Sequence, residues 1–169
     1  RPAWAVAGVS VIFLALTGLS DPREFSERIL YPSQQVVSDR ETPYGQVVIT
    51  RTGEQFNYYE NGTLLFSSGN EISNEENVHY AMAQHPRPAN VLLISGGFSG
   101  TLSEILKYKP ARLDYVELDP SLIGIASAFT RQLHDPAVRL HETDARRFIR
   151  KTDGRYDVVL VNLPPPSTL

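Results

Sequence analysis

The sequence predicts an α/β fold in which a small antiparallel β domain precedes part of a doubly wound parallel sheet, with a hydrophobic helix ahead of both. Three observations predict it. An Asn-Gly pair at positions 61–62 separates two runs rich in β-branched and aromatic residues, which indicates a hairpin. After residue 88, strand-like and helix-like patterns alternate, as is typical of a parallel sheet. Residues 2–20, near the amino end, are by contrast uncharged and mostly apolar.

Residues 1–20 form this hydrophobic segment. Nineteen uncharged residues separate Arg1 from Asp21, which approaches the length that spans a bilayer's hydrocarbon core. A transmembrane helix is the favoured interpretation, and a signal-peptide core and a buried helix of a soluble domain remain the alternatives. The favoured interpretation predicts a membrane as a partner, without fixing the side on which the rest of the chain lies.

The middle of the chain is predicted to hold a linker and then a small domain. Residues 21–43 are polar, mixed in charge and interrupted by prolines, which favours a linker. Residues 44–88 are predicted to form the antiparallel sheet, within 45–68, followed by one helix. Ser73 and Glu76 have the spacing of a capping box, which predicts that this helix covers about residues 74–84.

Residues 89–169 are predicted to form the first half of a Rossmann-like domain. An apolar run at 90–95 predicts the first buried strand. Thr101 and Glu104 predict a second capping box, and Asp119-Pro120 predicts a cap followed by a first-turn proline. A complete sheet would need more strands than the sequence holds. We therefore expect either that the sequence is a fragment or that the domain packs against another chain, such as a second copy in a homo-oligomer.

Composition excludes several classes of function. The net charge of −3 and the pI of about 5.8 give no electrostatic basis for binding nucleic acid. The chain has no cysteine, which excludes disulfides and thiolate metal sites. The four histidines, at positions 79, 85, 134 and 141, lack the tight spacing of metal ligands, so no metal is expected.

The main candidate site is the glycine turn after the first parallel strand. Gly96, Gly97 and Gly100 would let backbone N–H groups approach a ligand closely, although the G-x-G-x-x-G fingerprint is absent. Glu117 ends the second strand, where a carboxylate can accept hydrogen bonds from both ribose hydroxyls. Asp144 ends the third strand, where it could accept one from an adenine amino group. Because these strand ends meet at one edge, they predict an adenosine-containing ligand.

The alternative gives each of these residues a local role. In that interpretation the glycines only form a tight turn, Glu117 is a solvated strand end, and Asp144 caps the helix that follows it.

Five segments carry a likeness to a known family: PYGQVVITR, YYENGTLLFS, VHYAMAQHP, DYVELDP and NLPPPSTL. Together with the order of elements, they resemble the polyamine aminopropyltransferases, of which spermidine synthase is the familiar member. The likeness covers residues 44–169 and is close to bacterial spermidine-synthase-like proteins that carry membrane helices ahead of this unit. It implies a class I methyltransferase-like sheet and a bacterial protein associated with the inner membrane.

The resemblance implies roles for the nucleoside half of the site. Gly96 and Gly97 fall on the family's glycine-rich loop, and Glu117 falls on its ribose-binding glutamate. Asp144 and Ala145 fall on the position that contacts adenine. The implied nucleoside is decarboxylated S-adenosylmethionine or S-adenosylmethionine as the donor, or methylthioadenosine.

The amine half of the family's site is altered. His79 falls on a motif histidine that helps to line the polyamine pocket. Phe98 stands in place of an aspartate of the glycine loop, Asn162 in place of the catalytic aspartate, and Pro165 in place of a second aspartate. Aminopropyl transfer requires a neutral amine nucleophile. Asparagine has no basic form near neutral pH, so Asn162 could orient an amine but could not take its proton.

Two functions therefore remain. The first is an aminopropyltransferase-like or methyltransferase-like enzyme whose acceptor is less cationic than putrescine. The alternative is a catalytically silent, membrane-tethered domain that binds a nucleoside or an interaction partner. A fully formed ribose site beside a neutral pocket would support the enzyme, whereas Phe98 filling the adenosine site would support the silent domain.

Overall fold

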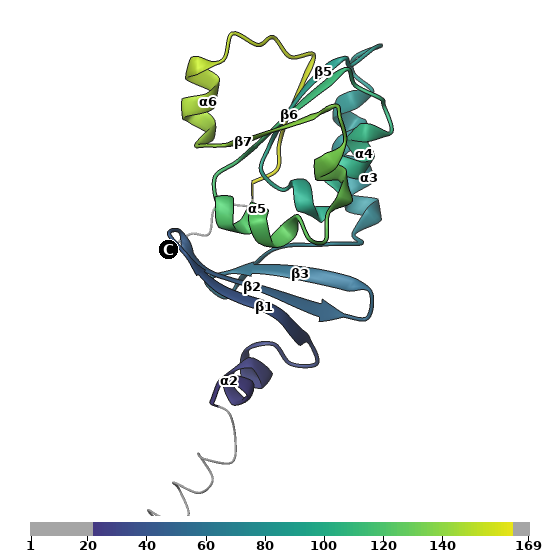
Figure 1. Cartoon of the computed structure of the whole chain (residues 1–169). Coiled ribbons are helices and arrows are strands. Elements are labelled where there is room, and N and C mark those ends of the chain that lie inside the picture. Colours follow the sequence, from purple (N-terminus) through teal and green to yellow (C-terminus); the bar gives the residue numbers. More distant parts are fainter. Residues whose placement is uncertain (1–21, 164–169) are drawn as a thin grey trace, which may run out of the picture.

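The structure is a computed structural model that describes residues 22–163, with side chains from residue 26 onward. The predicted hydrophobic segment at 1–20 and Pro165 lie outside these residues. Within 22–163, no helix combines the length and the apolar character that crossing a bilayer requires. The same residues form two four-stranded sheets, one antiparallel and one parallel, arranged one above the other (Figure 1). The predicted α/β architecture is thereby confirmed.

The antiparallel sheet has the strand order β1-β2-β3-β4. Its strands are β1 (Gln35–Thr42), β2 (Gly45–Thr52), β3 (Gln55–Glu60) and β4 (Thr63–Ser67). The predicted hairpin turn at Asn61-Gly62 is confirmed, because both residues have positive φ, 49° and 75°.

The segment predicted to be a linker instead contains regular secondary structure. Residues 21–43 hold helix α2 (Pro22–Leu30) and strand β1, which pairs along its length with β2. Strand β1 lies at the edge of the sheet, and its side chains are exposed or only half buried. An edge strand with exposed side chains needs few apolar residues. The polar composition of β1 therefore did not indicate a strand.

Strands β3 and β4 pair through a β-bulge. Tyr58 lies opposite Phe66 and Tyr59 lies opposite Leu64, so Leu65 has no partner across the ladder. Neighbouring side chains of a regular strand point to opposite faces. At the bulge, Leu65 and Phe66 both reach the same hollow beside the parallel sheet.

Helix α3 (Glu71–Met82) connects the two sheets, and its predicted start was wrong. The helix begins three residues before Asn74, and no side chain caps it at Asn70. Asn74 is buried within the helix, where its Nδ2 donates to the Ser99 carbonyl at 2.7 Å and its Oδ1 accepts from the Ser99 hydroxyl at 3.1 Å. Asn74 therefore anchors α3 to the glycine turn.

The parallel sheet has the strand order β7-β6-β5-β8. Its strands are β5 (Asn90–Ile94), β6 (Arg112–Glu117), β7 (Val138–Glu142) and β8 (Val158–Val161). The connections contain α4 (Thr101–Leu106), α5 (Pro120–Ala126) and α6 (Ala145–Lys151), with short 3₁₀ turns η1 (Gly97–Ser99) and η2 (Arg131–His134).

This strand order places a topological switch point between β5 and β8. The chain moves outward from β5 through β6 to β7, and then returns through α6 to add β8 on the other side of β5. Helix α6 accordingly lies on the opposite side of the sheet from α3 and α4 (Figure 1). Ligands of doubly wound sheets bind beyond the carboxyl ends of the strands at such a point.

The two cap predictions in this half had different outcomes. Asp119 accepts a hydrogen bond from the Ser121 amide at 2.8 Å, with Pro120 opening α5 as predicted. The capping box at Thr101 and Glu104 was wrong, because α4 follows Gly100 without a side-chain cap.

The main apolar core lies between the two sheets and beneath α3, α4 and α5. It includes Ile49, Tyr58, Met82, Leu93, Phe98, Leu102, Leu113 and Tyr115. A smaller cluster of Leu92, Ile94 and Val116 lies on the other face of the parallel sheet, under α6.

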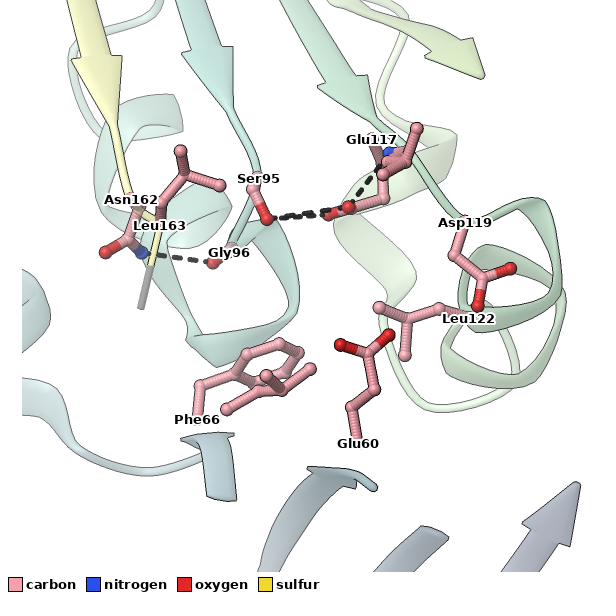
Figure 2. Close-up of a pocket in the computed structure, with 11 residues that line it drawn as sticks. Glu60, Phe66, Ser95, Gly96, Glu117, Asp119, Leu122, Asn162 and Leu163 are labelled. Carbon is pink, nitrogen blue, oxygen red and sulfur yellow. Dashed lines mark hydrogen bonds between the residues drawn. The ribbon is translucent and has the colours of Figure 1, made fainter. Parts of the chain in front are cut away.

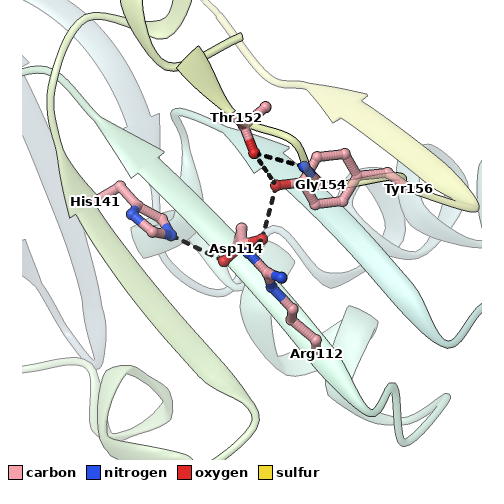
Figure 3. Close-up of polar contacts among 6 residues, drawn as sticks. All are labelled: Arg112, Asp114, His141, Thr152, Gly154 and Tyr156. Atoms are coloured by element: carbon pink, nitrogen blue, oxygen red, sulfur yellow. Dashed lines mark hydrogen bonds and ion pairs between the residues drawn. The ribbon is translucent and has the colours of Figure 1, made fainter.

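A buried charge cluster completes this second face. Asp114 is fully buried in β6 and is bound by His141 Nε2 at 2.8 Å, the Tyr156 hydroxyl at 2.7 Å and the Arg112 guanidinium at 2.7 Å (Figure 3). Burial alone would raise the pKa of Asp114, but the hydrogen bonds from these three side chains outweigh it and hold the pKa below its usual value. The cluster thus joins β6, β7 and the segment before β8.

Candidate functional site

Two adjoining hollows lie at the carboxyl ends of the parallel strands. The first hollow, of about 320 Å³, lies between these strand ends and the antiparallel sheet (Figure 2). The second hollow, of about 430 Å³, lies beside the start of α6. Both are lined by Ser95, Glu117, Leu118 and Leu163. The strand-end position predicted for the site therefore coincides with these two hollows.

Gly96 lies at the close approach of the β5 and β8 ends, on the wall of the first hollow. Its φ is +69°, and a Cβ there would lie 2.4 Å from Asn162 Nδ2 and 2.8 Å from the Asn162 carbonyl oxygen. Only glycine satisfies both the backbone angle and this space. Asn162 Nδ2 donates to the Gly96 carbonyl at 3.4 Å and to Thr101 Oγ1 at 3.2 Å. Asn162 therefore lines the first hollow and also fixes the glycine turn.

Gly97 and Gly100 serve packing, and neither lines a hollow. The Gly97 amide donates to the Tyr115 hydroxyl at 3.2 Å, and a Cβ at Gly97 would lie 2.6 Å from the Tyr115 ring. At Gly100, where φ is +115°, a Cβ would lie 2.8 Å from Asn74 Nδ2. These glycines let the turn lie against β6 and α3.

Glu117 occupies the junction of the two hollows, at the end of β6. It is 5% exposed, and its Oε2 accepts hydrogen bonds from the Tyr115 hydroxyl at 2.7 Å and from Ser95 Oγ at 3.3 Å. Its Oε1 accepts from the Leu118 amide at 3.0 Å. Burial raises the pKa of Glu117, although these hydrogen bonds oppose the increase. The carboxylate is thus held in one orientation, as Figure 2 shows for its contact with Ser95.

Asp144 and Ala145 line the second hollow together with Glu117. Asp144 Oδ1 accepts a hydrogen bond from the Arg147 amide at 2.9 Å, so Asp144 also caps α6. The ligand-binding and local interpretations of Asp144 are therefore compatible, because the cap uses one carboxylate oxygen. The structure brings Glu117, Asp144 and Ala145 together around one hollow.

Phe98 lies in the core and not in the substrate pocket where it was expected. It is 3% exposed, and its ring packs against Tyr58, Phe66 and Tyr115 at centroid distances of 6.5, 6.1 and 5.6 Å. Phe98 lines neither hollow, and it does not fill the strand-end site.

His79 also lies away from both hollows, between α3 and α4. Its Nδ1 is hydrogen-bonded to the Tyr108 hydroxyl at 2.7 Å, and its Nε2 lies 3.3 Å from Glu104. His79, Glu75 and Glu104 place three ligand atoms within 4.8 Å of one another, a grouping that histidine spacing alone could not reveal. The Lys107 ammonium, which contacts both carboxylates, already supplies positive charge there.

Sequence reasoning missed several residues of the first hollow, above all Glu60, Ser95 and Asp119. Glu60 ends β3 two residues beyond Tyr58, so alternation along a strand puts it on the face that meets the parallel sheet. Asp119 was recognised only as a cap, although it also lines the hollow. The strand period could have indicated the face of Glu60, but not that a second sheet faces it.

Comparison with known proteins identifies the family. Residues 70–169 match the spermine/spermidine synthase domain. The chain is 32% identical over 152 residues to a polyamine aminopropyltransferase of Leptospira interrogans, covering 85% of this chain and 30% of that protein. It is 32% identical over 175 residues to a polyamine aminopropyltransferase of Oceanobacillus iheyensis, covering 96% of this chain and 34% of that protein. The chain therefore belongs to the spermine/spermidine synthase family, and it spans about a third of the length of these curated relatives.

Solved structures show the same fold. A spermidine synthase in complex with the transition state analogue AdoDATO matches with a TM-score of 0.71 and 23% identity, covering 79% of this chain and 48% of that one. Spermidine synthase from Thermotoga maritima matches with a TM-score of 0.69 and 23% identity, covering 76% and 48%. The predicted resemblance to the spermidine synthase family is confirmed.

Proposed function

We propose that this chain forms the nucleoside-binding part of an aminopropyltransferase that uses decarboxylated S-adenosylmethionine as the donor and an amine as the acceptor. The names of the related proteins support this reaction class, as does the AdoDATO held by a spermidine synthase of the same fold. The acceptor itself is left open.

One observation carries the proposal: the fixed carboxylate of Glu117 lies at the junction of two hollows. A ribose bound there by its hydroxyls extends its base to one side and its 5′ substituent to the other. The second hollow, with Asp144 and Ala145, suits adenine. The first hollow then receives the sulfonium and its aminopropyl arm.

Transfer at this position is a substitution at carbon. The neutral acceptor nitrogen attacks the methylene carbon next to the sulfonium, a C–N bond forms, and the C–S bond breaks with its electron pair going to sulfur. The products are methylthioadenosine and a secondary ammonium, to which the positive charge of the sulfonium has passed. The protein contributes by orienting donor and acceptor and by excluding water.

The silent-domain alternative predicted that Phe98 would occlude the adenosine site. Phe98 is instead packed in the core, and the strand-end hollows are open. This placement favours ligand binding over a purely interacting domain. Membrane attachment through residues 1–20 stays a prediction, and fractionation of the full chain with and without that segment would test it.

Calorimetric titration tests the proposal. Decarboxylated S-adenosylmethionine and methylthioadenosine are expected to bind. Incubating the donor with a panel of amines, from monoamines to putrescine, and measuring the methylthioadenosine released by mass spectrometry identifies the acceptor. The absence of heat with S-adenosylmethionine, its decarboxylated form and methylthioadenosine would overturn the transferase assignment.

A further inference from the structure

The first hollow gathers carboxylates from both sheets. Glu60 reaches it from the end of β3, Asp119 from the start of α5, and Glu117 from the end of β6. Figure 2 shows the Glu60 side chain rising from the antiparallel sheet towards the strand ends that carry Gly96 and Glu117. No lysine, arginine or histidine is among the described residues that line this hollow. Its charged side chains are therefore all acidic.

Asp119, which lines this hollow, has an unused acceptor. The residue is 3% exposed, and its Oδ1 accepts from the Ser121 amide at 2.8 Å. Its Oδ2 is buried and has no hydrogen-bond partner within the part of the chain that the structure describes. A buried carboxylate oxygen without a hydrogen-bond donor costs free energy. A ligand that donates a hydrogen bond would remove this cost.

Glu60 is the second incompletely satisfied carboxylate. It is half buried, and among residues 26–163 its side chain has no hydrogen bond or ion pair. Burial, and then the nearby charges of Asp119 and Glu117, raise the pKa of Glu60. A positive charge placed among these three groups would relieve their repulsion.

The proposed orientation of the nucleoside puts such a charge in this hollow. With the ribose on Glu117, the 5′ substituent enters the hollow that Glu60 and Asp119 line. In decarboxylated S-adenosylmethionine this arm ends in a primary ammonium. In S-adenosylmethionine the same arm also carries a carboxylate, which the acidic wall would repel.

We propose that Glu60 and Asp119 form a primary-ammonium subsite that favours decarboxylated S-adenosylmethionine over S-adenosylmethionine. The inference rests on the proposed function. It assigns positive-charge binding to residues other than positions 98 and 162, where the resemblance expects aspartates and this chain has Phe98 and Asn162. The ammonium belongs to the aminopropyl arm of the donor or to the acceptor amine, and the two sources are separable by experiment.

The test measures ligand binding by calorimetry on the full chain and on its Glu60→Gln variant. Methylthioadenosine, which has no ammonium, should bind both proteins equally. If the donor's ammonium occupies the subsite, Glu60→Gln should weaken decarboxylated S-adenosylmethionine about tenfold, the effect of a lost interaction near 1.4 kcal/mol. If the acceptor's ammonium occupies it, the variant should instead weaken putrescine about tenfold when methylthioadenosine is already bound.

Two further variants make the test specific. Glu41→Gln removes an exposed carboxylate at the end of β1 and should leave all three ligands unaffected. Asp119→Asn should reproduce the Glu60→Gln effect, and both variants should reduce the preference for decarboxylated S-adenosylmethionine over S-adenosylmethionine.

The outcomes separate the two proposals. If methylthioadenosine binds and neither variant changes the affinity for decarboxylated S-adenosylmethionine or putrescine, the ammonium subsite is overturned while the proposed function stands. If the unmodified chain binds none of these nucleosides, the proposed function fails and the subsite fails with it.

Discussion

Strand β6 carries two buried carboxylates three residues apart, and their surroundings differ. Asp114 lies on the α6 side of the sheet and receives hydrogen bonds from His141, Tyr156 and Arg112. Glu117 lies at the strand end and is bound by two hydroxyls and a backbone amide, without a basic side chain among its described partners. The pKa of Asp114 lies below its usual value, whereas the pKa of Glu117 lies above it.

This difference distinguishes a structural carboxylate from one available to a ligand. At Asp114 the protein itself supplies donors to both carboxylate oxygens, including a guanidinium, so this carboxylate needs no ligand. Around Glu117 the nearby charged groups of the first hollow are the carboxylates of Glu60 and Asp119. Perturbed acids that lack a protein partner for their charge, and that line a concave surface, are candidates for ligand binding.

The largest expected effect is at Asp114, in the buried charge cluster. Asp114→Ala should lower the free energy of unfolding by about 3 kcal/mol, because it leaves the Arg112, His141 and Tyr156 donors without their acceptor. Urea denaturation monitored by circular dichroism measures it. Tyr156→Phe, which removes one of the three donors, should cost about 1 kcal/mol and serves as the graded control. Equal, small losses in both variants would contradict the view that Asp114 organises this face.

The second-largest expected effect is on ligand binding at Glu117, at the junction of the two hollows. Glu117→Gln should weaken methylthioadenosine binding about ten- to a hundredfold, because hydrogen bonds from ribose hydroxyls to a charged acceptor are lost. Stability should change little, since the variant also removes a buried charge that has no cationic partner in the described part of the chain. Calorimetry and urea denaturation together provide the two readouts. Glu76→Gln, at an exposed position on α3, is the matched control. A loss of stability in Glu117→Gln without a loss of binding would contradict the assignment of Glu117 to ligand binding.

A smaller effect is expected at Tyr115, whose hydroxyl is hydrogen-bonded to the Glu117 carboxylate. Its hydroxyl donates to Glu117 at 2.7 Å and accepts from the Gly97 amide at 3.2 Å. Tyr115→Phe should therefore reduce stability by about 1–2 kcal/mol and weaken nucleoside binding severalfold. The measurement is a double-mutant cycle with Glu117→Gln. Additive losses in binding would show that Tyr115 does not act through Glu117.

The smallest effect is a pH dependence of opposite sign in the two regions. The stability that Asp114 contributes is present above its unfolded pKa, about 3.9, and is lost as pH falls through its lowered folded pKa. For Glu117 the favourable contribution is present below about 4.3 and is lost as pH rises through its raised folded pKa. Urea denaturation between pH 2 and 7 should show that the free energy of unfolding of Glu117→Gln increases relative to that of the unmodified chain as pH rises. Asp114→Asn should approach the unmodified chain as pH falls, and parallel profiles for all three proteins would contradict both assignments.

Much of the fold was predictable because it depends on local patterns. The alternation of strands and helices, the Asn61-Gly62 turn and the Asp119-Pro120 helix start are set by the residues themselves. The capping box at Thr101 failed because its hydroxyl bonds between elements, to Ser99, Asn74 and Asn162, where a sequence pattern cannot place it. In α3 the side chain of Asn74 likewise bonds outside its own helix, to Ser99.

The site was predictable only in its nucleoside half. The strand-end rule located Glu117 and Asp144, because the carboxyl ends of parallel strands meet at one edge. Glu60 was missed because its role depends on how the antiparallel sheet faces the parallel one. Phe98 was misplaced for the same reason, since its ring fills the space between the two sheets.

The unpaired Leu65 of the β3–β4 ladder has a consequence for how this site can vary. Because one extra residue lets two adjacent side chains cover the floor of the first hollow, the length of that strand controls the shape of the floor. Deleting Leu65 would regularise the ladder, because Tyr58 would still lie opposite Phe66 and Tyr59 opposite Leu64, and it would remove one of the two adjacent side chains from the floor. The shape of the first hollow is thus open to change by a single-codon insertion or deletion in a hairpin far from the glycine turn in sequence.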